Sequence, residues 1–219
     1  MKLPTDRHNI APTIHVNISD MKRLLTFVTV LAAAVIISMA ADNATALLNS
    51  VASRVRSAKS LDISFKASGS SGKLLLAGDR FRMTSSEMTV WYDGRTQWAY
   101  SPSTGECNIT TPTSEELAQI NPFAIVKALR NNFTAKIVAN GKGTSTLLLT
   151  AKNKHSDFRT VRMTVNTSTK LPTAIDLTDR VGHVTKISVT SARIGATQPS
   201  SVFTFDKRKY PRAEIIDLR

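Results

Sequence analysis

The feature that most limits the fold of this chain is an alternation of apolar and polar residues that begins soon after residue 59. Leu61, Ile63 and Phe65 each have a polar or charged residue on either side. Successive side chains of a β-strand point to opposite faces, so a period of two predicts strands with one buried face. The pattern returns at residues 80–83, 135–138, 146–152, 159–166, 173–179, 184–190 and 202–205. These segments predict one large, mostly antiparallel curved sheet or barrel.

The clearest turn in this sheet lies at Asp93-Gly94. It separates two strand-like segments, 89–92 and 96–100, that are rich in aromatic and β-branched residues. An Asp-Gly pair between such segments is a strong hairpin signal, because both residues tolerate the backbone angles of a tight turn. We therefore predict that these two strands are antiparallel neighbours.

Helices are predicted at two places. Residues 42–59 carry apolar side chains at three- and four-residue steps, which is the period of an amphipathic helix with one buried stripe. Thr113 and Glu116 have the spacing of a capping box and predict a helix through residue 120. An Asn-Pro pair then predicts a second short helix over residues 121–130. The insert between the strands is therefore expected to be a bent helical pair.

The N-terminal residues have the pattern of an export signal. Residues 21–41 contain a basic start, an apolar run and small residues at a cleavage position, which is the order of a secretory signal peptide. The alternative is an uncleaved anchor, because the run is slightly shorter than the roughly 20 residues of a membrane span. We expect residues 1–20 to be a mis-assigned start or a disordered extension. The exported chain would then be a single domain, residues 42–219.

The exported chain is strongly basic. The full sequence has a formal charge of +13, and removal of residues 1–41, with four basic and two acidic side chains, leaves +11. Most such charges are expected to lie on a solvated surface, and the alternative is attraction to an anionic membrane or an acidic partner. Nucleic acid is not expected, because the protein is exported and its basic residues lack aromatic residues between them.

Little in the sequence points to catalysis or metal binding. Cys107 is the single cysteine, so neither an internal disulfide nor a cysteine-based zinc site is available, and we expect a buried, unreactive thiol. His155 and His183 lie near predicted turns, away from other metal-binding side chains. Phosphate-binding loops and nucleophile elbows are also missing from the sequence. We predict no enzyme activity, no metal and no cofactor.

The predicted sheet carries more large apolar side chains than a simple two-layer core requires. If the sheet and helices pack tightly, these side chains form an ordinary core. If the sheet curves too strongly to be filled, they line a cavity suited to acyl chains. The candidate cavity residues are Phe65, Leu74, Leu76, Phe81, Met83, Val90, Trp98, Tyr100, Met163 and Val165. The candidate lid residues on the helices are Leu47, Leu48, Val51, Val55, Leu117, Ile120 and Phe123.

The order of these features resembles that of the periplasmic outer-membrane lipoprotein carrier (LolA-like) family. The most specific element is the hairpin 93–102, which reads Asp-Gly-x-Thr-x-Trp-x-Tyr-x-Pro. The signal peptide, the first helix, the segment at Asn121-Pro122-Phe123 and the late segment 203–205 follow the same order. The C-terminal residues 210–219 are similar to those of Bacteroidetes-type relatives.

The resemblance implies both a fold and a function. The fold would be an α+β, mainly antiparallel, unclosed half-barrel of about 10–11 strands, whose concave apolar face lies under a lid formed by the N-terminal helix and the helical insert. The protein would be a monomeric periplasmic carrier that takes acylated lipoproteins from an inner-membrane release complex to an outer-membrane receptor or membrane surface. In relatives an arginine after the strand 72–77 ties the lid shut, whereas this chain has Ala77-Gly78-Asp79 there. Arg80 or Arg82 would be its substitute.

Two other classes of function fit the same residues. One is a sensor or interaction module with this fold that binds lipids or envelope proteins without transporting them. The other is an exported hydrolase with a dispersed active site, for which Asp93, His155 and His183 would be the candidate residues.

Overall fold

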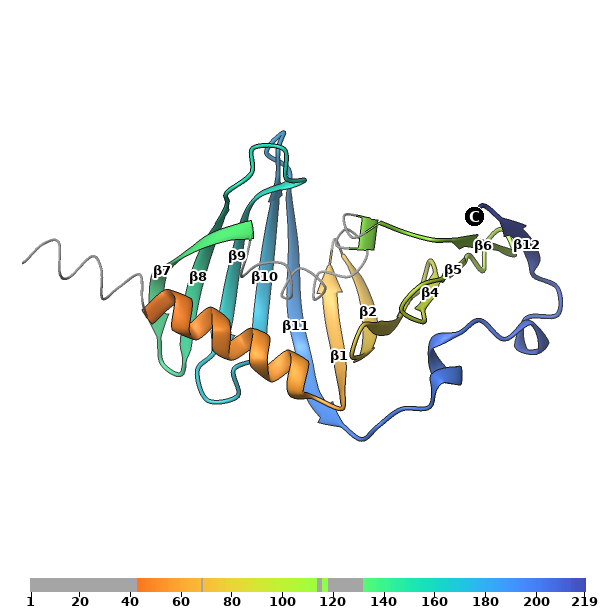
Figure 1. Ribbon diagram of the computed structural model, residues 1–219, viewed down its shortest axis with the longest axis horizontal. Helices are drawn as coiled ribbons and strands as arrows, with labels where there is room; N and C mark the ends of the chain where they lie inside the picture. The colour runs from red at the N-terminus through yellow and green to blue at the C-terminus, as the bar shows by residue number, and fades with distance from the viewer. Residues whose placement is uncertain (1–42, 68, 114–115, 118–131) are drawn as a thin grey trace, which may run out of the picture. The chain divides into compact units, whose positions relative to one another are not determined.

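The computed structural model of the chain describes residues 43–67, 69–113, 116–117 and 132–219, all within one compact unit, Ala40–Arg219. These residues form a helix at 43–57, a twelve-stranded sheet and two short 3-10 helices, and residues 116–117 and 132 are also helical (Figure 1). The predicted extension 1–20, the predicted signal peptide 21–41 and most of the predicted helical insert lie outside the described residues.

Residues 43–57 form the helix, close to the predicted 42–59. Its apolar stripe is buried: Ala44, Leu48, Val51 and Val55 are at most 9% exposed. In Figure 1 the helix runs across one face of strands β7–β11. The stripe therefore has the role that its period predicted, which is to cover the sheet.

The strands match most of the alternating segments of the sequence. Their bounds are β1 Ser60–Ala67, β2 Ser70–Ala77, β3 Arg80–Ser85, β4 Thr89–Tyr92, β5 Gln97–Tyr100, β6 Glu106–Thr110, β7 Phe133–Gly141, β8 Thr144–Ala151, β9 Phe158–Asn166, β10 Pro172–Asp179, β11 Val184–Gly195 and β12 Glu214–Asp217. Their order in the sheet is β12-β6-β5-β4-β3-β2-β1-β11-β10-β9-β8-β7. The sheet is open, because its two edge strands, β12 and β7, do not pair with each other. The prediction of an unclosed, mainly antiparallel α+β fold is confirmed.

Two meanders make up eleven of the twelve strands of this sheet, and β12 is added at the edge beside β6. Strands β1–β6 follow one another on one side and β7–β11 on the other, and the antiparallel pair β1 and β11 joins them. The β1–β11 register shifts between Ser64 and Phe65, where a bulge interrupts the ladder. Bulges bend and twist a strand locally, so this one contributes curvature where the two meanders meet.

The register assigns each residue to one of two faces. Ile63, Leu74, Met83, Val90 and Ala99 are successive cross-strand neighbours from β1 to β5. They belong to the same apolar cluster as the helix, and we call this side of the sheet the inner face.

The next cross-strand row points to the opposite side. It contains Asp62, Leu75, Arg82, Trp91 and Trp98. We call this side the outer face. Because side chains alternate, every residue of β1–β5 is assigned to a face by its place in these two rows.

The predicted hairpin at residue 93 is present. Tyr92 pairs with Gln97, and the Asp93 N–H donates to the Thr96 carbonyl across the turn. The Asp93 carboxylate accepts from the Arg95 and Thr96 N–H groups at 2.9 and 2.8 Å. Asp93 thus has a structural role in the turn, which is the role expected of aspartate in this position.

The predicted capping box is also present. The Thr113 N–H donates to the Glu116 carboxylate at 2.7 Å, and the Glu116 N–H donates to the Thr113 hydroxyl at 3.3 Å. These bonds lower the pKa of Glu116, the backbone bond most strongly. The remainder of the helical pair, residues 118–131, lies outside the described residues.

The C-terminal region differs from the sequence prediction. Residues 202–205 were expected to be a strand, but Ser200–Phe203 forms a 3-10 helix, η1, after Pro199. A second one, η2, covers Lys207–Lys209. The chain then enters β12, which was not predicted and which pairs in parallel with β6. The strand prediction for 202–205 was wrong because Phe203, which is completely buried, belongs to a turn of 3-10 helix and not to a strand.

Candidate functional site

The inner face brings together eight of the ten predicted cavity residues. Phe65, Leu74, Leu76, Phe81, Met83, Val90, Met163 and Val165 belong to one apolar cluster with the helix. They come from β1, β2, β3, β4 and β9, which are distant in sequence but share one side of the sheet.

The centre of the inner face on β8–β10 is fully buried in the cluster that includes the helix. Met163 and Val165 on β9 are 0% exposed, as are their neighbours Leu147 and Ile175. The predicted lid residues Leu48, Val51 and Val55 are buried in the same cluster, and Leu47 is partly buried against it. Leu117 also packs there, whereas Ile120 and Phe123 lie outside the described residues.

The β1–β3 part of the inner face is covered less completely. Phe65 and Met83 are only partly buried although they lie among fully buried neighbours. The Phe65 ring lies directly over Gly72, its cross-strand partner, so that a Cβ at position 72 would be 2.5 Å from the ring. Phe65 is therefore a large side chain that rests on a glycine with part of its surface open, which leaves it room to move.

An aromatic pair lies on the next part of the inner face. The rings of Phe81 and Tyr92 are 5.5 Å apart, on β3 and β4. Burial raises the pKa of Tyr92, and the carboxylates of Asp79 and Asp93 add to this effect. Tyr92 therefore carries its hydroxyl as a neutral group, consistent with an apolar face.

Trp98 and Tyr100 do not lie on the inner face, and the prediction for these two residues is wrong. Trp98 pairs with Trp91, and Tyr100 lies two residues further along β5 on the same side. Gln97 and Ala99 occupy the inner side of this strand instead. The four-residue turn 93–96 sets this register, and alternation alone gives no information about which of the two sets of residues faces inward.

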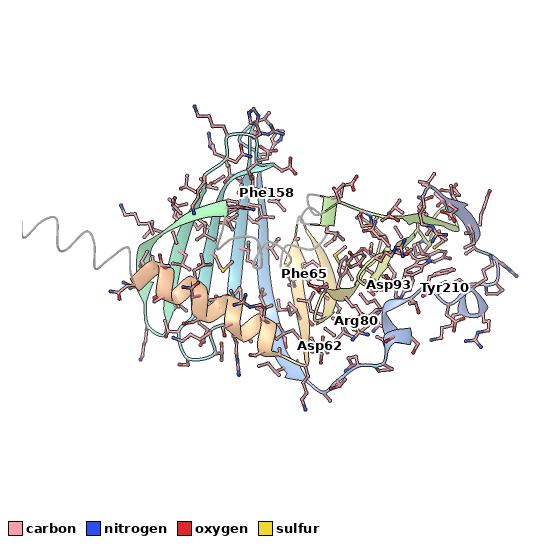
Figure 2. The ribbon with its side chains drawn as sticks, viewed as in Figure 1. Asp62, Phe65, Arg80, Asp93, Phe158 and Tyr210 are labelled. Carbon is pink, nitrogen blue, oxygen red and sulfur yellow. The ribbon has the colours of Figure 1, made fainter. Side chains whose placement is uncertain are left out.

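The outer face has its own aromatic cluster. Tyr210 stacks 5.2 Å from Phe205 and 4.6 Å from Tyr100, and Trp91 is 5.6 Å from Phe205. Phe205 and Tyr210 belong to the C-terminal segment, which lies along this face (Figure 2). Their aromatic identity was visible in the sequence, but their partners lie more than a hundred residues away and no local pattern indicated them.

The same segment contacts Arg80, one of the two arginines that were expected to replace the family's lid-closing arginine. Arg80 donates to the Ser200 hydroxyl at 2.9 Å and lies 4.9 Å from the centre of the Phe203 ring. Arg82 is in the outer row beside Trp91. Both side chains point away from the inner face, so the expectation that either ties a lid over that face is wrong.

The candidate reactive residues Cys107, His155 and His183 lie either in the core or in exposed turns. Cys107 is 0% exposed, and burial raises its pKa to about 11 although the charge of Lys207 opposes the shift. The thiolate is the reactive form, so this thiol is inert at neutral pH, as predicted. His183 lies in an exposed turn 3.2 Å from Asp179, and His155 is in another exposed turn.

Metal-binding and membrane-spanning features are absent from the described part of the chain. Within residues 43–67, 69–113, 116–117 and 132–219, no three acidic, histidine or cysteine side chains are grouped as a metal site requires. None of the helical residues among them forms a helix of sufficient length and hydrophobicity to span a bilayer.

The chain therefore has the fold of a half-barrel protein: an open, mainly antiparallel sheet whose apolar inner face packs against a helix. The model of the family described as "outer membrane lipoprotein carrier protein LolA" matches residues 35–183. This match extends over more than half of the chain, so the chain belongs to that family. No curated protein matches the sequence.

A solved structure shows the same fold at low sequence identity. An uncharacterized conserved protein from Thermus thermophilus superposes with a TM-score of 0.56 at 9% identity, covering 80% of this chain and 99% of that one. A LolA superfamily protein from Nitrosomonas europaea gives a lower TM-score of 0.39 at 14% identity, with 74% and 97% covered. The Pseudomonas aeruginosa MucA/MucB complex gives 0.42 at 14% identity, with 80% and 63% covered.

Proposed function

We propose that the protein is a non-catalytic periplasmic carrier that shields the acyl chains of lipoproteins against its inner face. The observation that supports this most directly is the apolar inner face itself, on which eight predicted residues and the helix form one cluster. The family description names a lipoprotein carrier, which fits this surface. The predicted signal peptide 21–41 would deliver residues 42–219 to the periplasm as a single domain, without residues 1–20.

The energies of burial are compatible with this role. Each methylene removed from water contributes about 0.8 kcal/mol, so a chain of about 16 carbons gains roughly 13 kcal/mol on full burial. To uncover the sheet, the helix would expose Leu48, Val51, Val55 and two alanines, at a cost of roughly 8 kcal/mol by the same measure. Burial of one acyl chain therefore offsets the free-energy cost of displacing the helix. Without an acyl chain, the apolar stripe of the helix stays packed on the sheet.

Release must follow from the same exchange. When the acyl chain leaves, the helix stripe can return to the sheet and recover most of the free energy lost, so neither the loaded nor the empty state is trapped. The cargo would be received from an inner-membrane release complex and handed to an outer-membrane receptor or membrane surface. The protein would act as a monomer and require no cofactor.

Native mass spectrometry of the protein purified from the envelope of expressing cells tests the proposal. We expect co-purified acylated polypeptide, uptake of an acyl probe whose fluorescence depends on its surroundings, and transfer of the cargo to outer-membrane vesicles. Absence of both cargo and probe uptake would reject the proposal. Binding without transfer would indicate instead a sensor or interaction module of the same fold.

Adjacent residues of β3 provide a matched pair of variants. Met83 is partly buried on the inner face, whereas Thr84 is exposed on the outer face. Met83→Asp should abolish probe uptake because a carboxylate on the apolar face is costly to desolvate. Thr84→Asp should leave uptake unchanged, and equal losses in the two variants would contradict the assignment of the binding surface to the inner face.

A further inference from the structure

The outer face contains a groove that the proposed carrier function does not use. It has a volume of about 610 Å³ and lies between strands β3 and β4 and the C-terminal segment. Its lining includes Arg82, Trp91, Phe205, Lys207, Lys209 and Tyr210. We propose that this groove binds the phosphate of an anionic phospholipid headgroup and so docks the protein on a membrane.

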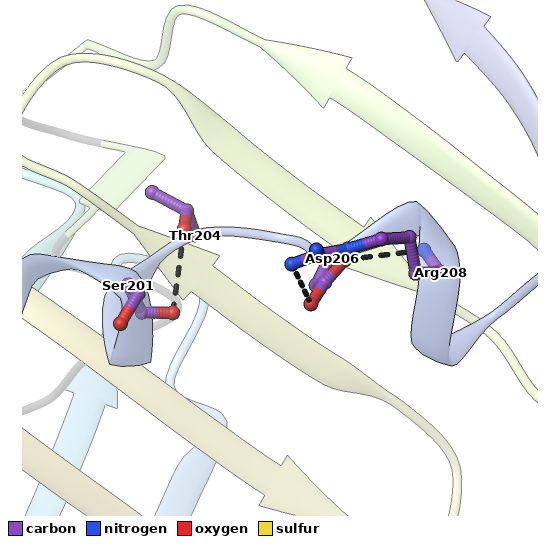
Figure 3. A network of polar contacts seen from close by, with 4 residues as sticks. All are labelled: Ser201, Thr204, Asp206 and Arg208. Carbon is purple, nitrogen blue, oxygen red and sulfur yellow. Dashed lines mark hydrogen bonds and ion pairs between the residues drawn. The ribbon is translucent and has the colours of Figure 1, made fainter.

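Positive charge dominates the groove. Four cationic side chains line it, against the single carboxylate of Asp206. That carboxylate is already paired, because Arg208 donates to its two oxygens at 3.0 and 3.1 Å (Figure 3). The Arg208 hydrogen bond is also the main cause of the lowered pKa of Asp206, to which Lys209 adds. Asp206 can therefore neutralise little of the remaining positive charge.

Arg82 is the cation best placed to meet a ligand. It is exposed on β3 beside Trp91 and has no ion-pair partner among the described residues. Lys209 reaches the groove from η2, on the opposite wall. A phosphate bound between two walls that both supply cations gains charge-assisted hydrogen bonds from each.

Contacts within the C-terminal segment hold one wall of the groove in shape. The Lys207 ammonium donates to the Ala213 carbonyl, and the Asp206 carboxylate accepts from the Arg208 N–H at the start of η2. Phe203 is completely buried, and Thr204 donates its hydroxyl to the Ser201 carbonyl (Figure 3). A site that is ordered before binding loses less entropy when the ligand arrives.

Apolar residues beside the groove favour a lipid over a soluble anion. Trp91, Phe205 and Tyr210 also line the groove; Trp91 is 5% exposed, whereas Phe205 and Tyr210 are partly exposed. The segment leads directly into β12, where Ile215 is 41% exposed, and Leu218 beyond it is 62% exposed. Cationic and apolar side chains that are exposed together are typical of surfaces that lie on anionic bilayers, and aromatic residues favour the level of the headgroups.

Vesicle binding tests this inference independently of acyl transport. Protein purified from the envelope of expressing cells is titrated with phosphatidylcholine vesicles, with and without phosphatidylglycerol. We expect binding to the anionic vesicles that weakens with salt. The double variant Arg82→Gln/Lys209→Gln should lower the affinity on the order of 30-fold, because each cation near the surface contributes about 1 kcal/mol.

A second double variant controls for net charge. Lys142→Gln/Lys154→Gln removes the same two charges from exposed turns outside the groove and should leave the affinity nearly unchanged. Ser201→Glu, which places a carboxylate in the groove at an exposed position, should weaken binding without removing any contact of the fold. Circular dichroism of each variant checks that the sheet is intact.

Three results would overturn the inference. Equal losses in the two double variants would show a general charge effect and no site. Binding of glycerol phosphate or inorganic phosphate without binding of anionic vesicles would show a soluble phosphate site. Failure of the unaltered protein to bind anionic vesicles would exclude docking on lipid. None of these results depends on whether the inner face takes up an acyl probe.

Discussion

The contact between Phe65 and Gly72 gives a prediction with a magnitude that can be worked from the structure. In the substitution Gly72→Ala, the new Cβ would lie 2.5 Å from the end of the Phe65 ring, whereas ordinary contacts begin at 3.4 Å. The ring must therefore shift by about 1 Å. Overpacking of this kind costs about 1–3 kcal/mol. Because Phe65 is only partly buried and can move, we expect the lower half of this range, about 1–2 kcal/mol.

A double-mutant cycle isolates this contact. In a Phe65→Ala background nothing opposes the methyl group, and replacing a strand glycine by alanine should stabilise the protein by about 0.5–1 kcal/mol. The coupling energy between the two positions is then about 2 kcal/mol. Urea unfolding followed by tryptophan fluorescence measures all four proteins. The same effect of Gly72→Ala in both backgrounds would refute the contact, and a stabilising Gly72→Ala in the parent protein would refute the overpacking argument.

Three further predictions concern the C-terminal region and the cysteine. Tyr210→Ala removes the stacking partner of Phe205 and should lower the free energy of unfolding by about 2 kcal/mol in urea titrations, whereas an unchanged value would contradict a stabilising aromatic cluster. Cys107, with its pKa of about 11, should resist iodoacetamide at neutral pH until the protein unfolds, and rapid labelling of the native protein would show that it is accessible. Asp217, whose pKa is lowered from 3.8 to about 2, chiefly by the hydrogen bond from Arg219, stabilises the fold above its ordinary pKa and loses this effect as the pH falls towards 2. Asp217→Asn should therefore flatten the stability curve over that interval, and an unaltered acid-unfolding profile would contradict the pairing.

Local features of the fold followed from short stretches of sequence. The helix at 43–57, the hairpin at 93–96 and the Thr113–Glu116 capping box each depend on residues within a few positions of one another. Periodicity and turn chemistry act at this range, so the sequence was sufficient to locate them. The buried, unreactive state of Cys107 also agreed with the expectation for a lone thiol on a strand.

The candidate site was predictable only in part. A period of two divides a strand into two sets of side chains, but the register of the neighbouring strands decides which set faces the helix. For β1–β4 the predicted set was the inner one, whereas on β5 the large residues Trp98 and Tyr100 lie outside. Size and hydrophobicity favoured the inner face for both residues. The sequence did not show that the rings of Phe205 and Tyr210 would pack against Tyr100 on the other side.

The sequence by itself determined that the chain would begin its fold with an amphipathic helix and continue in a long succession of antiparallel strands, because these depend on contacts between near neighbours. Only the tertiary structure decided which face of each strand became the apolar surface, and where the C-terminal segment would lie. The pairings that decided this, such as β1 with β11 and Trp91 with Phe205, join residues more than a hundred positions apart. Contacts at that separation leave no periodic pattern in the sequence, because they depend on how the completed elements fit together.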